Sequence, residues 1–219
     1  MTVMPTTHCL PDKVAMAYAA GTLPEALSIV VASHLSMCDE SRASVEGFDA
    51  VGGALLNSIE PVRLESDDNL LISTLALIRG GPIREQPAPK ESESLLPIPL
   101  QEYVGTDIAA VPWKSVGLGV EQVVVKTCGP ATVRLLKVPA GVAVPEHGHE
   151  GLEMTLVLQG ALIDHPSTLQ RGDISIVDQH CTHLPIADIS SNCICLTATE
   201  GALRFKSLSS KLAQVFRRI

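Results

Sequence analysis

The stretch GVAVPEHGHEGLEMTLVLQG, residues 141–160, most constrains how this chain can fold. It follows the frame Gly-x5-His-x-His-x3-Glu-x6-Gly, with glycines that permit sharp turns at both ends. On an extended strand His147 and His149 are two residues apart, so both point to the same face. Glu153 follows a short turn and can return to that face on the next strand. The stretch therefore predicts neighbouring strands that present three metal-binding side chains to one site.

A fourth ligand is expected from a later segment. RGDISIVDQHCTHLP, residues 171–185, offers His180, Cys181 and His183. Three imidazoles and one carboxylate suit a first-row divalent cation, so Zn²⁺, Fe²⁺, Mn²⁺ and Ni²⁺ all remain open. From the residues alone, the choice among the three later side chains is also open.

The pattern around these motifs is that of β-structure. Short runs rich in β-branched residues are separated by turns with Gly, Pro and Asp, which is typical of a sandwich or barrel. These runs are EQVVVK, ATVRLLKV, MTLVLQG, DISIV and CICLTAT.

Residues 11–80 have a different, helical pattern in which Ala and Leu dominate. Asp12 stands at a predicted helix start, where a carboxylate accepts unpaired amide hydrogens, and Gly21 at the stop. Pro24 fits the first turn of a second helix, because its missing N–H costs nothing there. Gly52-Gly53 is expected to interrupt or loosen a third helix. A fourth is expected to start at Asp67 or Asp68.

Composition and charge narrow the function classes. The chain is 46% hydrophobic and 18% charged, which argues against disorder, and no apolar run reaches the length of a membrane span. Its net charge is −8, from 16 basic and 24 acidic residues, without a basic patch, so direct nucleic-acid binding is disfavoured. The first residues carry no basic region followed by an apolar stretch, so a cytoplasmic protein with reduced cysteines or metal-ligating cysteines is expected.

The frame at residues 141–160, together with a downstream histidine, resembles the first motif of the cupin superfamily. That resemblance implies a small double-sheeted β-barrel with a metal at its mouth. The second cupin motif has a Pro-x-Gly turn before its histidine. The segment RGDISIVDQHCTH departs from that form.

The helical half carries a second constellation. His34 and Cys38 are four residues apart, so they share one face of a helix and can bind one metal. The run AYAAGTLPEALSIVVASHLSMCDES resembles zinc-binding anti-sigma domains, whose usual frame is an upstream His and then His-x3-Cys-x2-Cys. In this chain Ser41 stands at the second cysteine of that frame, and Cys9 stands where the upstream histidine is expected, with His8 beside it.

A neutral serine hydroxyl is a poor zinc ligand beside a thiolate. The predicted N-terminal set is therefore Cys9, His34 and Cys38, completed by His8, a water or a nearby carboxylate. Whether zinc occupies it is left open, because helices that hold by packing alone would explain the same residues.

Nearly the whole chain is similar to ChrR-type anti-sigma factors, which join such a helical domain to a cupin. The similarity implies an all-α anti-sigma domain at 1–85, a linker at 86–100, which is rich in Pro, Ser and Glu, and an all-β cupin barrel at 101–219. It favours His183 as the fourth cupin ligand, beside His147, His149 and Glu153. Zinc is the first expectation for the metal.

The function that the resemblance implies is regulatory. The helical domain would bind and inhibit an extracytoplasmic-function (group IV) sigma factor, and the cupin would be required for the response to oxidant stress of the singlet-oxygen type. No enzyme activity, nucleic-acid contact or membrane contact is expected, and a homodimer is left open. The alternative is a metal-dependent cupin enzyme, a dioxygenase or isomerase, with an accessory helical domain.

Overall fold

The computed structural model describes residues 8–62, 70–80 and 94–205 of the 219-residue chain. The chain groups into two compact units. The first joins residues 1–49 to residues 94–219, and the second spans residues 50–93.

The helices of the first unit begin and end at residues that the sequence marks. α1 starts at Asp12, directly after Pro11, and α2 starts directly after Pro24. Pro11 and Pro24 are the N-cap residues and neither helix has a side-chain cap, so the expected capping by Asp12 and the expected place of Pro24 in the first turn are wrong. Gly21 has a φ of +64°, a left-handed conformation that glycine adopts without strain, and it turns the chain between the two helices. The helices are α1 (Asp12–Ala19), α2 (Glu25–Leu35), the first part of α3 (Asp39–Asn57) and α5 (Ile98–Val104).

The second unit contains the end of α3 and all of α4 (Leu70–Gly80). α3 continues through Gly52-Gly53, so the expected interruption is wrong. Each helical glycine costs only about 1 kcal/mol relative to alanine, and the surrounding Ala and Leu residues favour the helix. The predicted start at Asp67 or Asp68 lies outside the described residues.

The strands form one large and two small antiparallel sheets. The large sheet has the order β1-β2-β3-β11-β5-β8, and the small sheets have the orders β10-β6-β7 and β12-β4-β9. The strands are β1 (Lys114–Gly117), β2 (Val120–Val125), β3 (Thr132–Val138), β4 (His147–His149), β5 (Glu153–Gln159), β6 (Ala161–Asp164), β7 (Ser167–Gln170), β8 (Ile174–Val177), β9 (Thr182–His183), β10 (Ile186–Ala187), β11 (Cys193–Thr199) and β12 (Leu203–Phe205).

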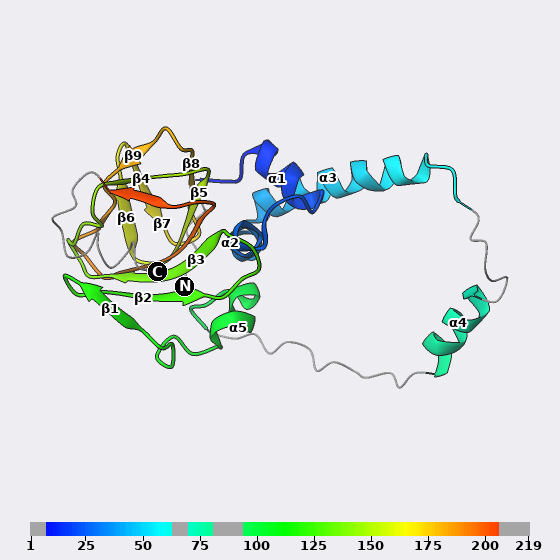
Figure 1. The fold of residues 1–219 in the computed structure, drawn as a ribbon, viewed down its shortest axis with the longest axis horizontal. Coiled ribbons are helices and arrows are strands. Elements are labelled where there is room, and N and C mark those ends of the chain that lie inside the picture. Colours follow the sequence, from blue (N-terminus) through cyan, green and yellow to red (C-terminus); the bar gives the residue numbers. More distant parts are fainter. Residues whose placement is uncertain (1–7, 63–69, 81–93, 206–219) are drawn as a thin grey trace. The chain divides into compact units, whose positions relative to one another are not determined.

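Both faces of the large sheet are buried, which explains why β3, β5 and β11 are buried at nearly every position. One face looks into the barrel, where Leu136, Val157 and Cys195 belong to one apolar cluster. The other face packs against helices, and Leu135 and Leu156 belong to a second cluster with α2 and α5. Figure 1 shows α2 beside β3, and α2 also contacts β5 and β11.

The two compact units do not coincide with the expected domains, which were a helical domain ending at residue 85 and a linker ending at residue 100. α1 and α2 belong to the same compact unit as the barrel. Leu96 and Leu100, expected in the linker, are buried in the cluster that joins helices to sheet. The rest of the expected linker, up to residue 93, lies outside the described residues. The predicted order, helices first and then a β-barrel, is confirmed. No helix among the described residues combines the length and apolarity of a membrane span.

Candidate metal centre

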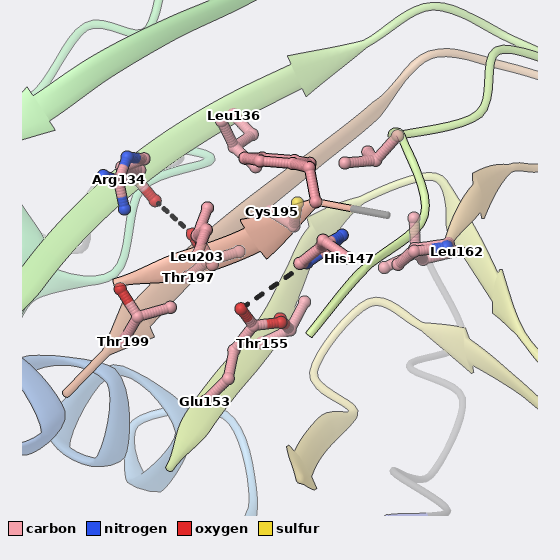
Figure 2. A pocket seen from close by; sticks show the side chains of 13 residues that line it. Arg134, Leu136, His147, Glu153, Thr155, Leu162, Cys195, Thr197, Thr199 and Leu203 are labelled. Carbon is pink, nitrogen blue, oxygen red and sulfur yellow. Dashed lines mark hydrogen bonds and ion pairs between the residues drawn. The ribbon is translucent and has the colours of Figure 1, made fainter. Parts of the chain in front are cut away.

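The candidate metal centre lies where β4, β5 and β9 meet. His147 and His183 are direct cross-strand partners on β4 and β9, and Glu153 is the first residue of β5. His183 Nε2 lies 3.3 Å from Glu153 Oε1, and His147 Nε2 lies 3.7 Å from Glu153 Oε2. The ligand atoms of these three residues all lie within 4.8 Å of one another. Figure 2 shows His147 and Glu153 turned toward each other in the cavity of the barrel.

Hydrogen bonds fix the orientation of each histidine ring. His147 Nδ1 lies 2.7 Å from the Pro145 carbonyl, and His149 Nδ1 lies 3.0 Å from the Gly151 carbonyl. A carbonyl only accepts, so each Nδ1 carries a hydrogen, and Nε2 is the ring nitrogen left to bind a metal. The Nε2 atom of buried His149 has no hydrogen-bond partner among the described residues. The Nε2 atoms of the two rings are thus the ones that a divalent cation would bind.

Asp164 is a candidate site residue that the sequence analysis did not predict. Its Oδ2 lies 2.8 Å from His183 Nδ1, so it orients the ring with Nε2 toward the cluster. Carboxylates commonly hold metal-binding histidines in this way. Asp164 lies on β6, outside the histidine motif, and no spacing rule connects it with His183.

Glu153 and its histidine neighbours shift one another's pKa values. Burial alone would raise the pKa of Glu153, but His147 and His183 lower it to about 2. Burial alone would lower the pKa of His183, but Asp164 and Glu153 raise it to about 9. Without a metal, His183 is thus protonated at neutral pH, and a cation that binds its Nε2 must displace that proton.

The remaining predicted ligands are placed as follows. The ring centroid of His149 lies 6.0 Å from that of His183, beside the three clustered residues. His180, the alternative to His183, is exposed and on no strand. The full set of His147, His149, Glu153 and His183 stays a prediction. A metal held there would act as a Lewis acid or a structural tie.

The N-terminal cluster consists of Cys9, His34, Cys38 and Ser41. Ser41 lies at its centre and is buried. Its Oγ lies 2.9 Å from His34 Nε2 and 3.3 Å from Cys38 Sγ, and it accepts a hydrogen bond from the backbone N–H of Leu10 at 2.9 Å. Because His34 Nδ1 faces the Gly172 carbonyl at 2.9 Å, Nδ1 carries the hydrogen, and Ser41 donates to Nε2.

The predicted N-terminal zinc ligands are only partly gathered. Cys9 Sγ lies 3.5 Å from Cys38 Sγ. Among the described residues, however, Cys9, His34 and Cys38 do not form a group of the kind that the barrel residues form. His8 lies against Asp173 instead, with its Nδ1 3.5 Å from Oδ2. Zinc binding at this cluster therefore stays a prediction. Hydrogen bonds through Ser41 already connect His34 with Cys38.

Comparison with known proteins agrees with this architecture. Residues 101–202 match the family described as the ChrR cupin-like domain. Over 216 residues, 99% of this chain and 100% of the relative, the chain is 47% identical to anti-sigma-E factor ChrR of Cereibacter sphaeroides. It is also similar to a chain in the crystal structure of Rhodobacter sphaeroides SigE in complex with the anti-sigma ChrR. That match has 45% identity and a TM-score of 0.77, and it covers 88% of this chain and 98% of the other.

Proposed function

Because this chain belongs to the ChrR family of anti-sigma factors, we propose that it binds an extracytoplasmic-function (group IV) sigma factor and keeps it from RNA polymerase. A chain of this family is a regulator rather than an enzyme, so the dioxygenase or isomerase alternative is set aside. Sigma factors act with RNA polymerase, so the proposed site of action is the cytoplasm. Contact with DNA or with a membrane is no part of the proposal.

The observation that carries this proposal is the surface of α4. An isolated amphipathic helix shows one apolar stripe, whereas a helix that is apolar on every side is normally buried on every side. α4 has apolar residues on most of its circumference, interrupted by Ser73, Thr74 and Arg79, and it is exposed along its length. A partner that encloses it would bury that surface. The exposed apolar residues are Leu70, Leu71, Ile72, Leu75, Leu77 and Ile78.

Other exposed apolar residues of the second unit also support a sigma-factor binding surface there. Val51, Leu55 and Leu56 of α3, and Ile59 and Val62 after it, are also exposed. By contrast, the apolar residues of α2 are buried against the barrel sheet and are not free to bind a partner. We therefore place sigma-factor binding mainly within residues 50–93, rather than evenly over residues 1–85.

The test is binding of the full chain to an extracytoplasmic-function sigma factor of the same organism. Leu71 and Leu77 are 68% and 76% exposed. Burying a whole leucine side chain contributes about 1.5–3 kcal/mol, so changing both to alanine removes about 2–4 kcal/mol. This corresponds to a dissociation constant about 30- to 700-fold higher. Alanine keeps the helix, so circular dichroism should not change.

Ile189 is the matched control, because it is 84% exposed but lies in a loop of the barrel. Ile189→Ala should change the dissociation constant less than about twofold. Wild-type affinity in the Leu71→Ala/Leu77→Ala variant would contradict the placement on α4. A full chain that neither co-purifies with the sigma factor nor blocks its transcription in vitro would contradict the function itself.

We propose further that a metal in the barrel is required for release of the sigma factor under oxidant stress of the singlet-oxygen type. What supports this part is the cluster of His147, Glu153 and His183, whose ligand atoms all lie within 4.8 Å of one another, together with the burial of α2 against the same barrel. His147→Ala should leave sigma inhibition intact and abolish release when a photosensitiser generates singlet oxygen. Normal release by a metal-free His147→Ala protein would contradict the metal requirement.

A further inference from the structure

The wall of the barrel cavity contains a buried cation whose charge is only partly compensated. Arg134 is 6% exposed and lies on β3, opposite Thr197 on β11. Among the described residues the Nε atom of Arg134 has no hydrogen-bond partner. Burial lowers the pKa of Arg134, and the charge of the Glu153 carboxylate only partly opposes that shift. The carboxylate of Glu153 contacts His147 and His183 instead. An arginine keeps its charge even when buried, so this cation calls for an anion.

Thr199 is a second buried polar group without a partner in the same cavity. It is 2% exposed, and its Oγ1 forms no hydrogen bond with the described residues. On the inner face of the sheet, Thr199 is the cross-strand partner of Glu153, in the row next to that of Arg134. Diagonal neighbours of this kind have Cα atoms about 7–8 Å apart, within reach of a long side chain. Figure 2 shows Arg134 and Thr199 on one side of the Glu153 carboxylate and His147 on the other.

The cavity that these side chains line has a volume of about 30 Å³. A water needs about 10–15 Å³ measured in this way, so the space suits two or three waters or one ligand of about four non-hydrogen atoms. The rest of the wall is largely apolar and includes Leu136, Leu162 and Phe205. The cavity therefore favours a ligand with one anionic end and one small apolar end.

We propose that the barrel cavity binds a short-chain monocarboxylate such as acetate. The carboxylate accepts hydrogen bonds from the guanidinium of Arg134, which presents parallel donors that match a carboxylate, and from the hydroxyl of Thr199. The methyl end lies against the apolar wall. The inference goes beyond sigma-factor binding and does not rest on it.

Water would satisfy the hydrogen bonds but would add no charge beside Arg134, whose burial is only partly offset by a Glu153 carboxylate that also pairs with two histidines. Inorganic phosphate brings charge but has no apolar end to match the wall. A divalent cation held by the neighbouring histidines would add positive charge to the interior, which favours a bound anion further. One carboxylate thus accounts for both of the unpartnered groups and for the shape of the cavity.

The experiment is thermal unfolding of the full chain in sodium acetate against sodium chloride at equal ionic strength. Acetate at ten times its dissociation constant is expected to raise the wild-type Tm by about 3–6 °C, in a saturable manner. Arg134→Met should lose that rise. In chloride its Tm should equal or exceed that of the wild type, because replacing an incompletely compensated buried charge by an apolar side chain is neutral or stabilising.

Lys137→Met is the matched control, because Lys137 is a cation of the same strand that pairs with Glu121 away from the cavity. It should keep the full acetate effect. Thr199→Val, which is nearly isosteric, should raise the acetate dissociation constant about fivefold or more, and it tests the site even if Arg134→Met folds poorly. The proposal is overturned if acetate adds nothing over chloride in the wild type. It is equally overturned if Arg134→Met keeps the whole acetate-dependent rise in Tm, which is the result expected if acetate bound only to a metal. If Arg134→Met does not fold, the same result with Thr199→Val overturns it.

Discussion

Replacing Ser41 by alanine is expected to destabilise the first compact unit strongly, although it removes only one oxygen atom. That oxygen accepts from the Leu10 N–H and donates to His34 Nε2, each at 2.9 Å. Ser41 is 1% exposed and His34 is fully buried, so water cannot easily replace the lost partner. The substitution therefore leaves one buried donor and one buried acceptor unpaired.

The size of the effect follows from those two groups. Each buried polar group left without a partner costs about 1–3 kcal/mol, so the free energy of unfolding should fall by about 2–6 kcal/mol. For a chain of this length, 1 kcal/mol corresponds to about 2–4 °C, so the Tm should fall by at least about 4 °C. The loss should fall on the unit that contains α1, α2 and the barrel, because His34 also bonds the Gly172 carbonyl at the turn before β8.

The assay is differential scanning calorimetry of the full chain, with and without a zinc chelator. Ser33→Ala is the matched control, because Ser33 is equally buried on α2 but its Oγ has no hydrogen-bond partner among the described residues. Removing that hydroxyl should leave the Tm unchanged or slightly raised. A Ser41→Ala protein that loses no more stability than Ser33→Ala would refute the role assigned to the Ser41 hydroxyl.

Four further outcomes test the two candidate metal centres. Ser41→Cys should raise zinc affinity at the N-terminal cluster, measured by competition with a chelator, and leave the barrel metal unchanged; equal affinity would mean that position 41 does not reach the metal. Asp164→Asn should weaken metal binding in the barrel about 10- to 100-fold, and the double substitution His147→Ala/His149→Ala should abolish it in elemental analysis. Because the pKa of His183 is raised to about 9, metal binding displaces its proton below that pH. Apparent affinity should therefore rise about tenfold per pH unit between about pH 7 and 9 and level off above; an affinity independent of pH would contradict this protonation state.

The sequence was a sufficient guide where local chemistry decides the structure. The starts of α1 and α2, the turn at Gly21 and the runs that became β2, β3, β5 and β11 follow from proline, glycine and β-branched patterns. The pairing of His147 with Glu153 also follows from local spacing, because the two residues are only six positions apart.

Contacts between distant segments could not be read in this way. Asp164 orients His183 from another strand, and Arg134 and Thr199 share one cavity although 65 positions separate them. The register of β3 with β11 sets that second proximity, and a shift by one residue would turn those side chains to the other face.

By itself, the sequence determined that helices precede a barrel and that the barrel carries a histidine and glutamate motif. These features depend on periodicity and on short spacings, which are local properties of the chain. Only the tertiary structure decided that α1 and α2 belong with the barrel rather than with α4. The physical reason is that the outer face of the large sheet is apolar, and covering it with α2 and α5 removes both apolar surfaces from water.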